Sequence, residues 1–209
     1  MTSFTGKPQT VALALTGASG AQYGLRLLEL LLQNDVKVYL MMSKPGQIVI
    51  NMETDLKLSG KNQDMQKTLS QLYNAKEGQL RLFDKDQWTA PIASGTGVAD
   101  ATVICPCTMG TLAAVANGLS NNLIERAADV AIKERRSLIV VPRESPFSPI
   151  HLQNMLQLAQ AGVTIMPPNP GFYYRPTSIE EVVDFVVARI LDHLHIAHSL
   201  LPRWGEEKQ

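Results

Sequence analysis

A short apolar run that ends in a glycine-containing turn constrains the fold more than any other feature of this chain. Residues 10–16 read Thr-Val-Ala-Leu-Ala-Leu-Thr and are followed directly by Gly17-Ala-Ser-Gly20. The next segment, residues 21–33, is rich in leucine and predicts a nearly buried helix. A buried strand, a tight turn and a buried helix in this order are typical of an α/β protein with a parallel sheet.

The same alternation continues along the chain. Further strands are predicted at residues 36–42, 101–105, 137–141 and 163–166, and further helices at 108–116, at 121–135 and after Ser178. Ser178-Ile-Glu-Glu181 predicts a capping box at the start of the last helix. The polar segment 54–88 is expected to be an excursion from the sheet. We therefore expect one Rossmann-like α/β domain over residues 1–209, a three-layer sandwich around a mostly parallel sheet, with flexible ends at 1–8 and 205–209.

Charge and cysteine usage narrow the function classes. Nineteen basic residues balance nineteen acidic ones, and charged residues make up 18% of the chain, below the usual share of about 25%. This balance argues against a nucleic-acid partner. Residues 101–124 and 145–174 contain no charged side chain but hold Pro, Asn and Ser, so we expect buried loops or subunit interfaces of an oligomer there rather than membrane spans. Cys105 and Cys107 stand too close together for an ordinary disulfide, which indicates a reducing, cytoplasmic location.

Small and hydroxyl-bearing residues follow the predicted strands. In an open parallel sheet, ligands bind outside the carboxyl ends of the strands. A glycine-containing turn that opens a helix presents backbone N–H groups to a phosphate, and four hydroxyls could add donors: Ser19, Ser43, Thr108 and Thr111. The turn lacks the G-x-G-x-x-G pattern, which argues against a nicotinamide cofactor and leaves a mononucleotide site as the better interpretation.

The sequence does not favour a metal site. Cys105-Pro-Cys107 lacks the second ligand pair of a zinc site. His193 and His195 are expected on different faces of the last helix. The acidic run 180–184 imitates a magnesium-binding motif, but its place in the first helical turn is better explained by compensation of the helix dipole.

Five motifs in order resemble those of the UbiX-type flavin prenyltransferases, whose superfamily also contains flavin-dependent cysteine decarboxylases. They are Thr16-Gly-Ala-Ser-Gly20, Pro106-Cys-Thr-Met-Gly-Thr111, Glu125-Arg-Ala-Ala-Asp-Val-Ala-Ile-Lys133, Val141-Pro-Arg-Glu-Ser-Pro-Phe-Ser148 and Pro167-Pro-Asn-Pro-Gly-Phe-Tyr173. The resemblance implies transfer of a dimethylallyl unit from dimethylallyl phosphate to reduced FMN, with a new ring closed between N5 and C6. The product would be prenylated FMN, the cofactor of a partner decarboxylase in ubiquinone biosynthesis. The family is dodecameric.

The resemblance also implies residue roles. The flavin site would comprise Gly17, Ala18, Ser19, Ser43, Thr108, Met109, Gly110, Thr111 and Arg143. The prenyl phosphate would meet Tyr173, Arg189, Arg126 and Lys133. Catalytic roles would belong to Glu144, Ser19, Glu53 and Lys133, with Trp88 and Trp204 as aromatic walls. Gly110 departs from many relatives, which have Lys or Arg there.

These residue types suit prenyl transfer. Positive charge assists phosphate departure, and aromatic rings shelter a carbocation-like alkyl group. A base must then remove the C6 proton, a role we expect for Glu144. The residues are spread over separate segments, so we expect the site to be assembled between subunits.

Two other functions are open at this point. A flavin-dependent cysteine decarboxylase would have a histidine on the first helix and an asparagine in the 106–111 loop, but no histidine precedes His151 and Gly110 stands in the asparagine's place. A non-catalytic FMN-binding protein would need no second anion site, so it would not explain why Lys133, Tyr173 and Arg189 all match the family.

Overall fold

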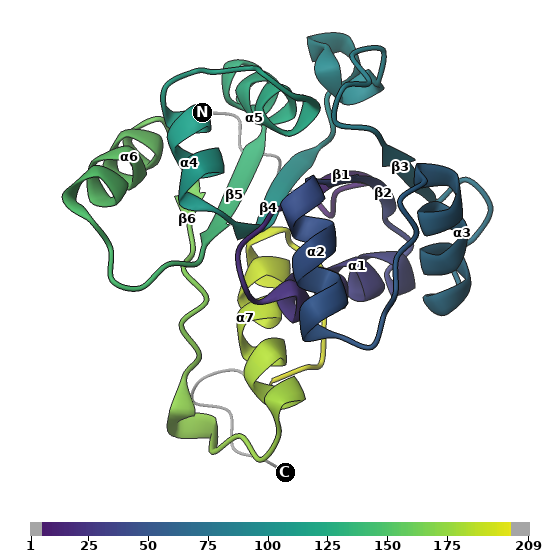
Figure 1. The fold of residues 1–209 in the computed structure, drawn as a ribbon. Helices are drawn as coiled ribbons and strands as arrows, with labels where there is room; N and C mark the ends of the chain where they lie inside the picture. Colours follow the sequence, from purple (N-terminus) through teal and green to yellow (C-terminus); the bar gives the residue numbers. More distant parts are fainter. Residues whose placement is uncertain (1–5, 202–209) are drawn as a thin grey trace.

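Six parallel strands form the centre of the molecule. The computed structural model describes residues 6–201, and its sheet has the order β3-β2-β1-β4-β5-β6 (Figure 1). The strands are β1 (Thr10–Leu15), β2 (Lys37–Met42), β3 (Leu80–Phe83), β4 (Ala101–Cys107), β5 (Ser137–Pro142) and β6 (Thr164–Ile165). This is the strand order of doubly wound nucleotide-binding folds, so the expected Rossmann-like architecture is confirmed.

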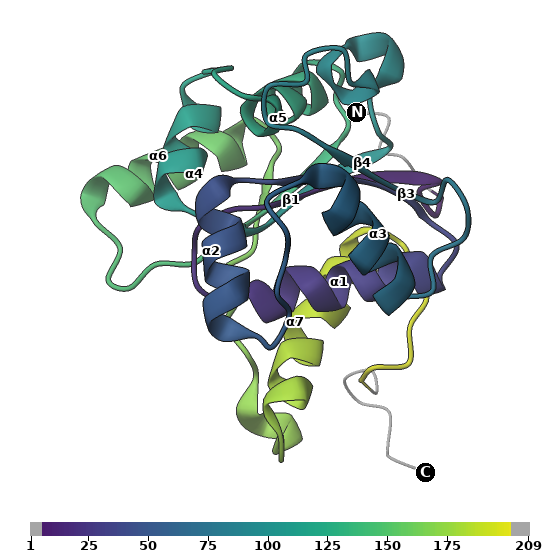
Figure 2. The same ribbon diagram turned by 45° about the vertical axis from the view of Figure 1, so that its right-hand side comes forward.

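Helices cover both faces of the sheet. Figure 2 shows α1 (Ala21–Gln33), α3 (Asn62–Leu72) and α7 (Ile179–His193) on one side, with α4 (Met109–Ala116), α5 (Leu123–Lys133) and α6 (Pro149–Gln160) on the other. Helix α2 (Lys44–Glu53) joins the α1 side through its buried Ile50. Three short 3-10 turns complete the fold: Pro91–Ala93, Gly95–Gly97 and Phe172–Tyr174.

The strands are apolar throughout because each face meets a helical layer. Leu13 points into the core on the α1 side and Ala14 into the core on the α4 side. Both are fully buried, as parallel strands covered on two faces require. Each large side chain buried in this way contributes about 1.5–3 kcal/mol.

Two segments differ from expectation. The supposed excursion at 54–88 contains α3 and a sixth strand, β3, which pairs with β2 in register Leu40↔Leu82. Four residues, one of them an exposed arginine, are too short for a strand pattern to stand out. The charge-free stretch 145–174 contains α6, where Ser148 and His151 form a complete capping box.

The capping box expected at α7 is only half right. The Ser178 side chain accepts from the Glu181 N–H at 3.2 Å, as expected. The Glu181 carboxylate instead accepts from the backbone N–H of Thr177 at 2.6 Å, one residue before the N-cap. The helix start is still capped, since both groups satisfy donors that lack helical partners.

Several helices end at the amino edge of the sheet in the same way. Asp35, Arg135 and His195 have φ near +55° and Gly162 has φ of +89°, each just beyond a helix C-terminus. The following N–H closes the helix; that of Arg136, for example, donates to the Ala131 carbonyl at 2.8 Å. These are left-handed caps of the kind that satisfy the last helical carbonyls.

Candidate functional site

The carboxyl ends of β1 and β4 lie side by side at the point where the strand order reverses. Thr16 joins them: its hydroxyl donates to the Pro106 carbonyl at 2.9 Å and accepts from the Thr108 N–H at 2.8 Å. Ser43, at the end of β2, donates its N–H to the Leu15 carbonyl at 3.0 Å. Ligands of doubly wound sheets bind at this switch point, so its loops form the candidate site.

Gly17 is required by a close backbone approach. A Cβ at this position would lie 2.4 Å from the Cβ of Pro45 at the start of α2. Pro45 is held there because the Ser43 hydroxyl caps α2, accepting from the Gly46 N–H at 3.0 Å. The turn after β1 and the start of α2 therefore form one tightly packed surface.

Glu53 occupies the start of α1. Its carboxylate accepts from the N–H groups of Gly20 at 2.8 Å and Ala21 at 2.9 Å, which the sequence analysis offered to a phosphate. Burial alone would raise the pKa of Glu53. The hydrogen bonds from the Ser19 hydroxyl and from these two N–H groups, together with the charge of Arg143, lower the pKa by more than burial raises it, so the pKa lies below its ordinary value. Glu53 is thus an ionised, partly buried cap linked to Ser19.

The start of α4 is open. The Thr108 hydroxyl accepts from the Thr111 N–H at 3.1 Å and lies 2.9 Å from the Thr111 hydroxyl. The N–H groups of Met109 and Gly110 precede the first helical hydrogen bond and so lack helical acceptors. A Cβ at Gly110 would meet nothing within 4 Å. This helix start, rather than that of α1, has free donors for a phosphate.

Arg143 and Glu144 follow β5 at the same edge. The Arg143 N–H donates to the Cys107 carbonyl at 3.2 Å, which fixes the chain beside β4. Both side chains are exposed, and the Glu144 carboxylate accepts from the Ser145 N–H at 3.1 Å. The proposed base therefore borders the open site and keeps an oxygen available.

The cations assigned to the prenyl phosphate do not join this cluster within one chain. Lys133 ends α5 shortly before β5 begins, and so lies toward the amino edge of the sheet. Arg189 lies one helical turn before His193, which lines a cavity at that edge. Arg126 donates to the Ala93 carbonyl at 3.0 Å, against the loop that follows β3.

Each of these cations has a neighbouring carboxylate. Arg126 pairs with Asp129 at 2.8 Å and Arg189 with Asp192 at 2.7 Å. Lys133 pairs with Glu134. Exposed pairs of this kind are worth about 0–1 kcal/mol, so a phosphate could recruit the cations at small cost.

The predicted aromatic residues lie on exposed segments. Tyr173 is 56% exposed and Trp88 is 49% exposed. Tyr173 contacts Tyr174 and the Phe185 ring of α7, with ring centroids 4.5 and 5.8 Å away, in the arm that projects from the body in Figure 1. Trp204 lies outside the described residues.

Comparison with known proteins identifies the family of this chain. The flavoprotein family model matches residues 3–191. The flavin prenyltransferase UbiX of Pseudomonas aeruginosa is 56% identical over 200 residues, which cover 96% of each chain. The chain belongs to the UbiX flavin prenyltransferase family. The resemblance seen in the motifs is therefore confirmed over nearly the whole length.

Solved structures of the family superpose closely. AnUbiX, solved in complex with FMN and dimethylallyl pyrophosphate, matches with a TM-score of 0.85 and 36% identity, covering 96% of this chain and 100% of its own. A dodecameric FMN-dependent UbiX-like decarboxylase from Escherichia coli O157:H7 matches with a TM-score of 0.83 and 36% identity, covering 94% and 100%. The family fold is thus shared with proteins that hold FMN.

Residues 6–201 contain no group of three His, Cys, Asp or Glu side chains placed to hold a metal ion. No helix within that range is long and apolar enough to cross a bilayer. Thr16, which joins the two strand ends, is the one positioning residue that the sequence analysis did not single out by itself. The sequence feature that could have identified Thr16 is a hydroxyl residue at the end of the buried apolar run 10–16.

Proposed function

We propose that this chain is a flavin prenyltransferase that moves a dimethylallyl group from dimethylallyl phosphate to reduced FMN. The observation that supports it most is the switch-point cluster: Glu53 holds Ser19 at the start of α1 while the start of α4 keeps free donors. One edge thus offers both an anion site and ionisable groups. The family membership supplies the reaction.

FMN fits these residues as the prenyl acceptor. Its phosphate can accept hydrogen bonds from the N–H groups of Met109 and Gly110 and from the hydroxyls of Thr108 and Ser43. The space at Gly110 is open, since a Cβ there would meet nothing within 4 Å. The Glu53 carboxylate excludes the phosphate from the start of α1, since it already holds those N–H groups. A flavin ring would then lie toward Ser19, Arg143 and Glu144.

The chemistry falls to side chains around that ring. The donor's carbon–oxygen bond breaks and phosphate leaves, assisted by Lys133, Arg126 and Arg189. N5 of the reduced flavin bonds to C1 of the dimethylallyl group as phosphate leaves, and the phosphate can take the N5 proton. Ring closure then bonds C6 to C3 of that group, so C2 of its double bond gains a proton while C6 loses one to Glu144. Ser19, hydrogen-bonded to the ionised Glu53, can pass a proton beside the ring.

A single chain leaves this site incomplete. Glu144 and Glu53 lie at the carboxyl edge, whereas Lys133 lies toward the amino edge. The charge of Arg189 acts on Tyr174 in the projecting arm, beside Tyr173. Neighbouring copies must therefore bring these groups together. The dodecameric relative supports such an assembly. We propose a homo-oligomer, acting in the cytoplasm, whose product is passed to a prenyl-FMN-dependent decarboxylase of ubiquinone biosynthesis.

The donor is proposed to be the monophosphate. Three cations can neutralise a phosphate dianion without a metal, whereas a pyrophosphate brings more charge. The AnUbiX complex contains the pyrophosphate, so both donors should be tested. We expect faster turnover with dimethylallyl phosphate and no loss of activity in EDTA.

The deciding experiment is anaerobic incubation of the protein with reduced FMN and dimethylallyl phosphate, followed by mass spectrometry of the flavin. A prenyltransferase yields FMN enlarged by one five-carbon unit. Unchanged FMN bound at one per subunit would instead indicate an FMN-binding protein. Carbon dioxide released from a peptide with a C-terminal cysteine would indicate the decarboxylase, although α1 contains no histidine to serve as its base.

A further inference from the structure

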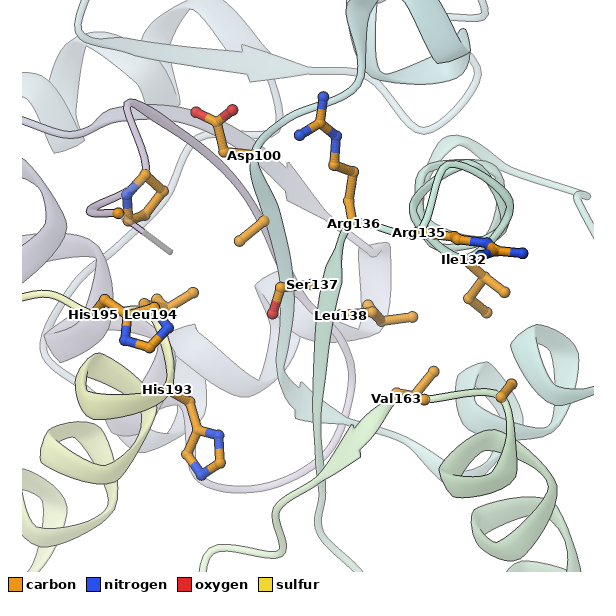
Figure 3. A pocket seen from close by; sticks show the side chains of 15 residues that line it. Asp100, Ile132, Arg135, Arg136, Ser137, Leu138, Val163, His193, Leu194 and His195 are labelled. Atoms are coloured by element: carbon orange, nitrogen blue, oxygen red, sulfur yellow. The ribbon is translucent and has the colours of Figure 1, made fainter. Parts of the chain in front are cut away.

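A cavity lies at the opposite edge of the sheet from the proposed flavin site. It has a volume of about 540 Å³ and opens at the amino ends of β4 and β5, between the C-terminal ends of α5, α6 and α7 (Figure 3). Small-molecule sites commonly have volumes of about 300–1,000 Å³. The cavity is therefore large enough for a ligand of modest size.

The inner wall of this amino-edge cavity is apolar. Leu138 at the start of β5 and Val163 just before β6 line it, and Leu194 does so beyond α7. Their exposures of 2%, 6% and 2% show that they belong to the core and present only a small apolar surface to the hollow. A ligand body resting here must itself be apolar or aromatic.

The rim of the cavity is cationic. Arg135, Arg136, His193 and His195 line it, all exposed. Figure 3 shows the two histidines at the end of α7 and Arg136 on another side of the hollow, with Asp100. Among residues 6–201, neither arginine forms an ion pair, unlike the three cations assigned to the prenyl phosphate.

Asp100 does not neutralise this rim by a direct ion pair. One carboxylate oxygen of Asp100 accepts hydrogen bonds from the backbone N–H groups of Gln9 and Thr10, both at 2.9 Å, and so holds the start of β1 in place. The rest of the cavity lining contains no acid. Together with the ion pair from Lys133, the charge of Arg136 lowers the pKa of the nearby Glu134 carboxylate. Within residues 6–201, however, neither arginine forms a direct ion pair with a carboxylate, so an anion at the rim could bind both guanidinium groups.

Compensation of helix dipoles explains only part of this pattern. Cations do stabilise helix C-termini, and α5 and α7 end here. However, α1 ends at the same edge on an acidic residue, Asp35, with the same left-handed cap. A cation still meets this helix end, since Lys7 Nζ donates to the carbonyl of Asn34, the C-cap residue of α1. The side chains of Arg135 and Arg136 make no such hydrogen bond within residues 6–201, and dipoles do not explain a hollow with an apolar wall.

We infer that the amino-edge cavity is a second binding site, for a small organic anion with an aromatic or apolar body. The apolar wall takes the body and the arginines of the rim take the carboxylate or related group. Within one chain this site is separate from the proposed flavin site, because it lies at the amino ends of the strands and the flavin site at their carboxyl ends.

The test is calorimetric binding of naphthalene-2-carboxylate, with 2-naphthalenemethanol as the neutral probe of the same shape. The full chain is titrated both with and without saturating FMN, so that binding in the flavin site is separated. We expect the carboxylate to bind under both conditions and at least tenfold more tightly than the alcohol. Equal binding of the two probes, or loss of binding when FMN is present, would overturn the inference.

Variants locate the site. Arg135→Gln/Arg136→Gln should weaken carboxylate binding about tenfold. Lys61→Gln/Lys67→Gln, at the N-cap and within α3, removes the same charge elsewhere and should leave binding unchanged. Ala161→Tyr, at an exposed lining position, should block the cavity with both arginines retained. Thermal melts confirm that each variant is folded, and unaltered affinity in the folded arginine and Ala161 variants would refute the site.

Discussion

The two edges of the same sheet differ in how much of each is organised within one chain. At the carboxyl edge, side chains from distant segments are hydrogen-bonded to one another: Thr16 joins β1 to β4, and Glu53 caps α1 from the end of α2. At the amino edge, helices end in left-handed caps, and the long-range contacts include those of Asp100 with the start of β1 and of Lys76 with Asp35. Lys133 there pairs with its neighbour Glu134, and within residues 6–201 Arg135 and Arg136 form no ion pair.

This difference suggests which of the proposed reaction groups act within their own protomer and which act on a neighbouring copy. Of the groups that we propose to lie around the flavin, Glu53 is held by a long-range hydrogen bond, that from the Gly20 N–H across 33 residues, whereas Glu144 has a local one from the Ser145 N–H. Groups that only supply charge, such as Lys133, are held by local pairs and can be offered to another copy. Substitutions at the first kind should alter chemistry in the same protomer, and at the second kind in a neighbour.

The largest expected effect is at the carboxyl edge. Glu144→Gln should slow ring closure by about 10²–10⁴-fold while FMN binding is retained, because the amide cannot take the C6 proton. Product formation by mass spectrometry and FMN binding by absorbance measure the two effects. Glu181→Gln, whose carboxylate only caps α7, is the matched control and should remain active. Wild-type turnover in Glu144→Gln would remove its role.

The next effect tests the division between the edges. Lys133→Ala or Arg189→Ala should reduce prenyl transfer by about 10²-fold with unchanged FMN affinity, because each stabilises the leaving phosphate. Co-assembly of Lys133→Ala protomers with Glu144→Gln protomers should restore activity, since some interfaces then combine intact Glu144 with intact Lys133. If mixed oligomers gain nothing over either variant alone, both groups act within one chain. Lys67→Ala is the control.

Some of this division could be predicted from the sequence. Buried strands and the α1 leucines show clear patterns, and the hydroxyl residues predicted at strand ends lie at the carboxyl edge of the sheet. Glu53 could not be identified as the α1 cap from local pattern, because its partners Gly20 and Ala21 lie on another element. The short strand β3 and the weakly amphipathic α6 were missed because neither has a distinctive period.

A smaller effect concerns the Glu53 carboxylate. Its pKa in the folded protein lies below the ordinary value of 4.5, so it stabilises the fold at pH values above 4.5. That contribution should disappear as the pH falls from 4.5 through the lowered pKa. Urea unfolding of the wild type and Glu53→Gln measures it: the stability difference should be constant near neutral pH and shrink in acid. A difference that grows in acid would contradict the assigned direction.

The smallest effect belongs to the amino edge. Arg135 has φ of +55°, where glycine avoids the strain of a side chain, so Arg135→Gly should stabilise the protein by about 0.5–1 kcal/mol. Arg136→Gly is the comparison, because that residue does not have positive φ and the change should destabilise. Chemical denaturation measures both, and stabilisation by Arg136→Gly as well would show that backbone conformation is not the cause.

The central strand β4 contains two cysteines whose side chains face opposite helical layers. Cys105 continues the alternation of Ala101 and Val103 and lies in the core on the α1 side. A register shift between Ile104 and Cys107 turns Cys107 into the core on the α4 side. Burial raises the pKa of both thiols, so neither is a reactive thiolate in the closed protein. Each cysteine can therefore be alkylated only after its side of the core opens. The alkylation rates of Cys105 and Cys107, measured separately by mass spectrometry, would report how often each helical layer opens.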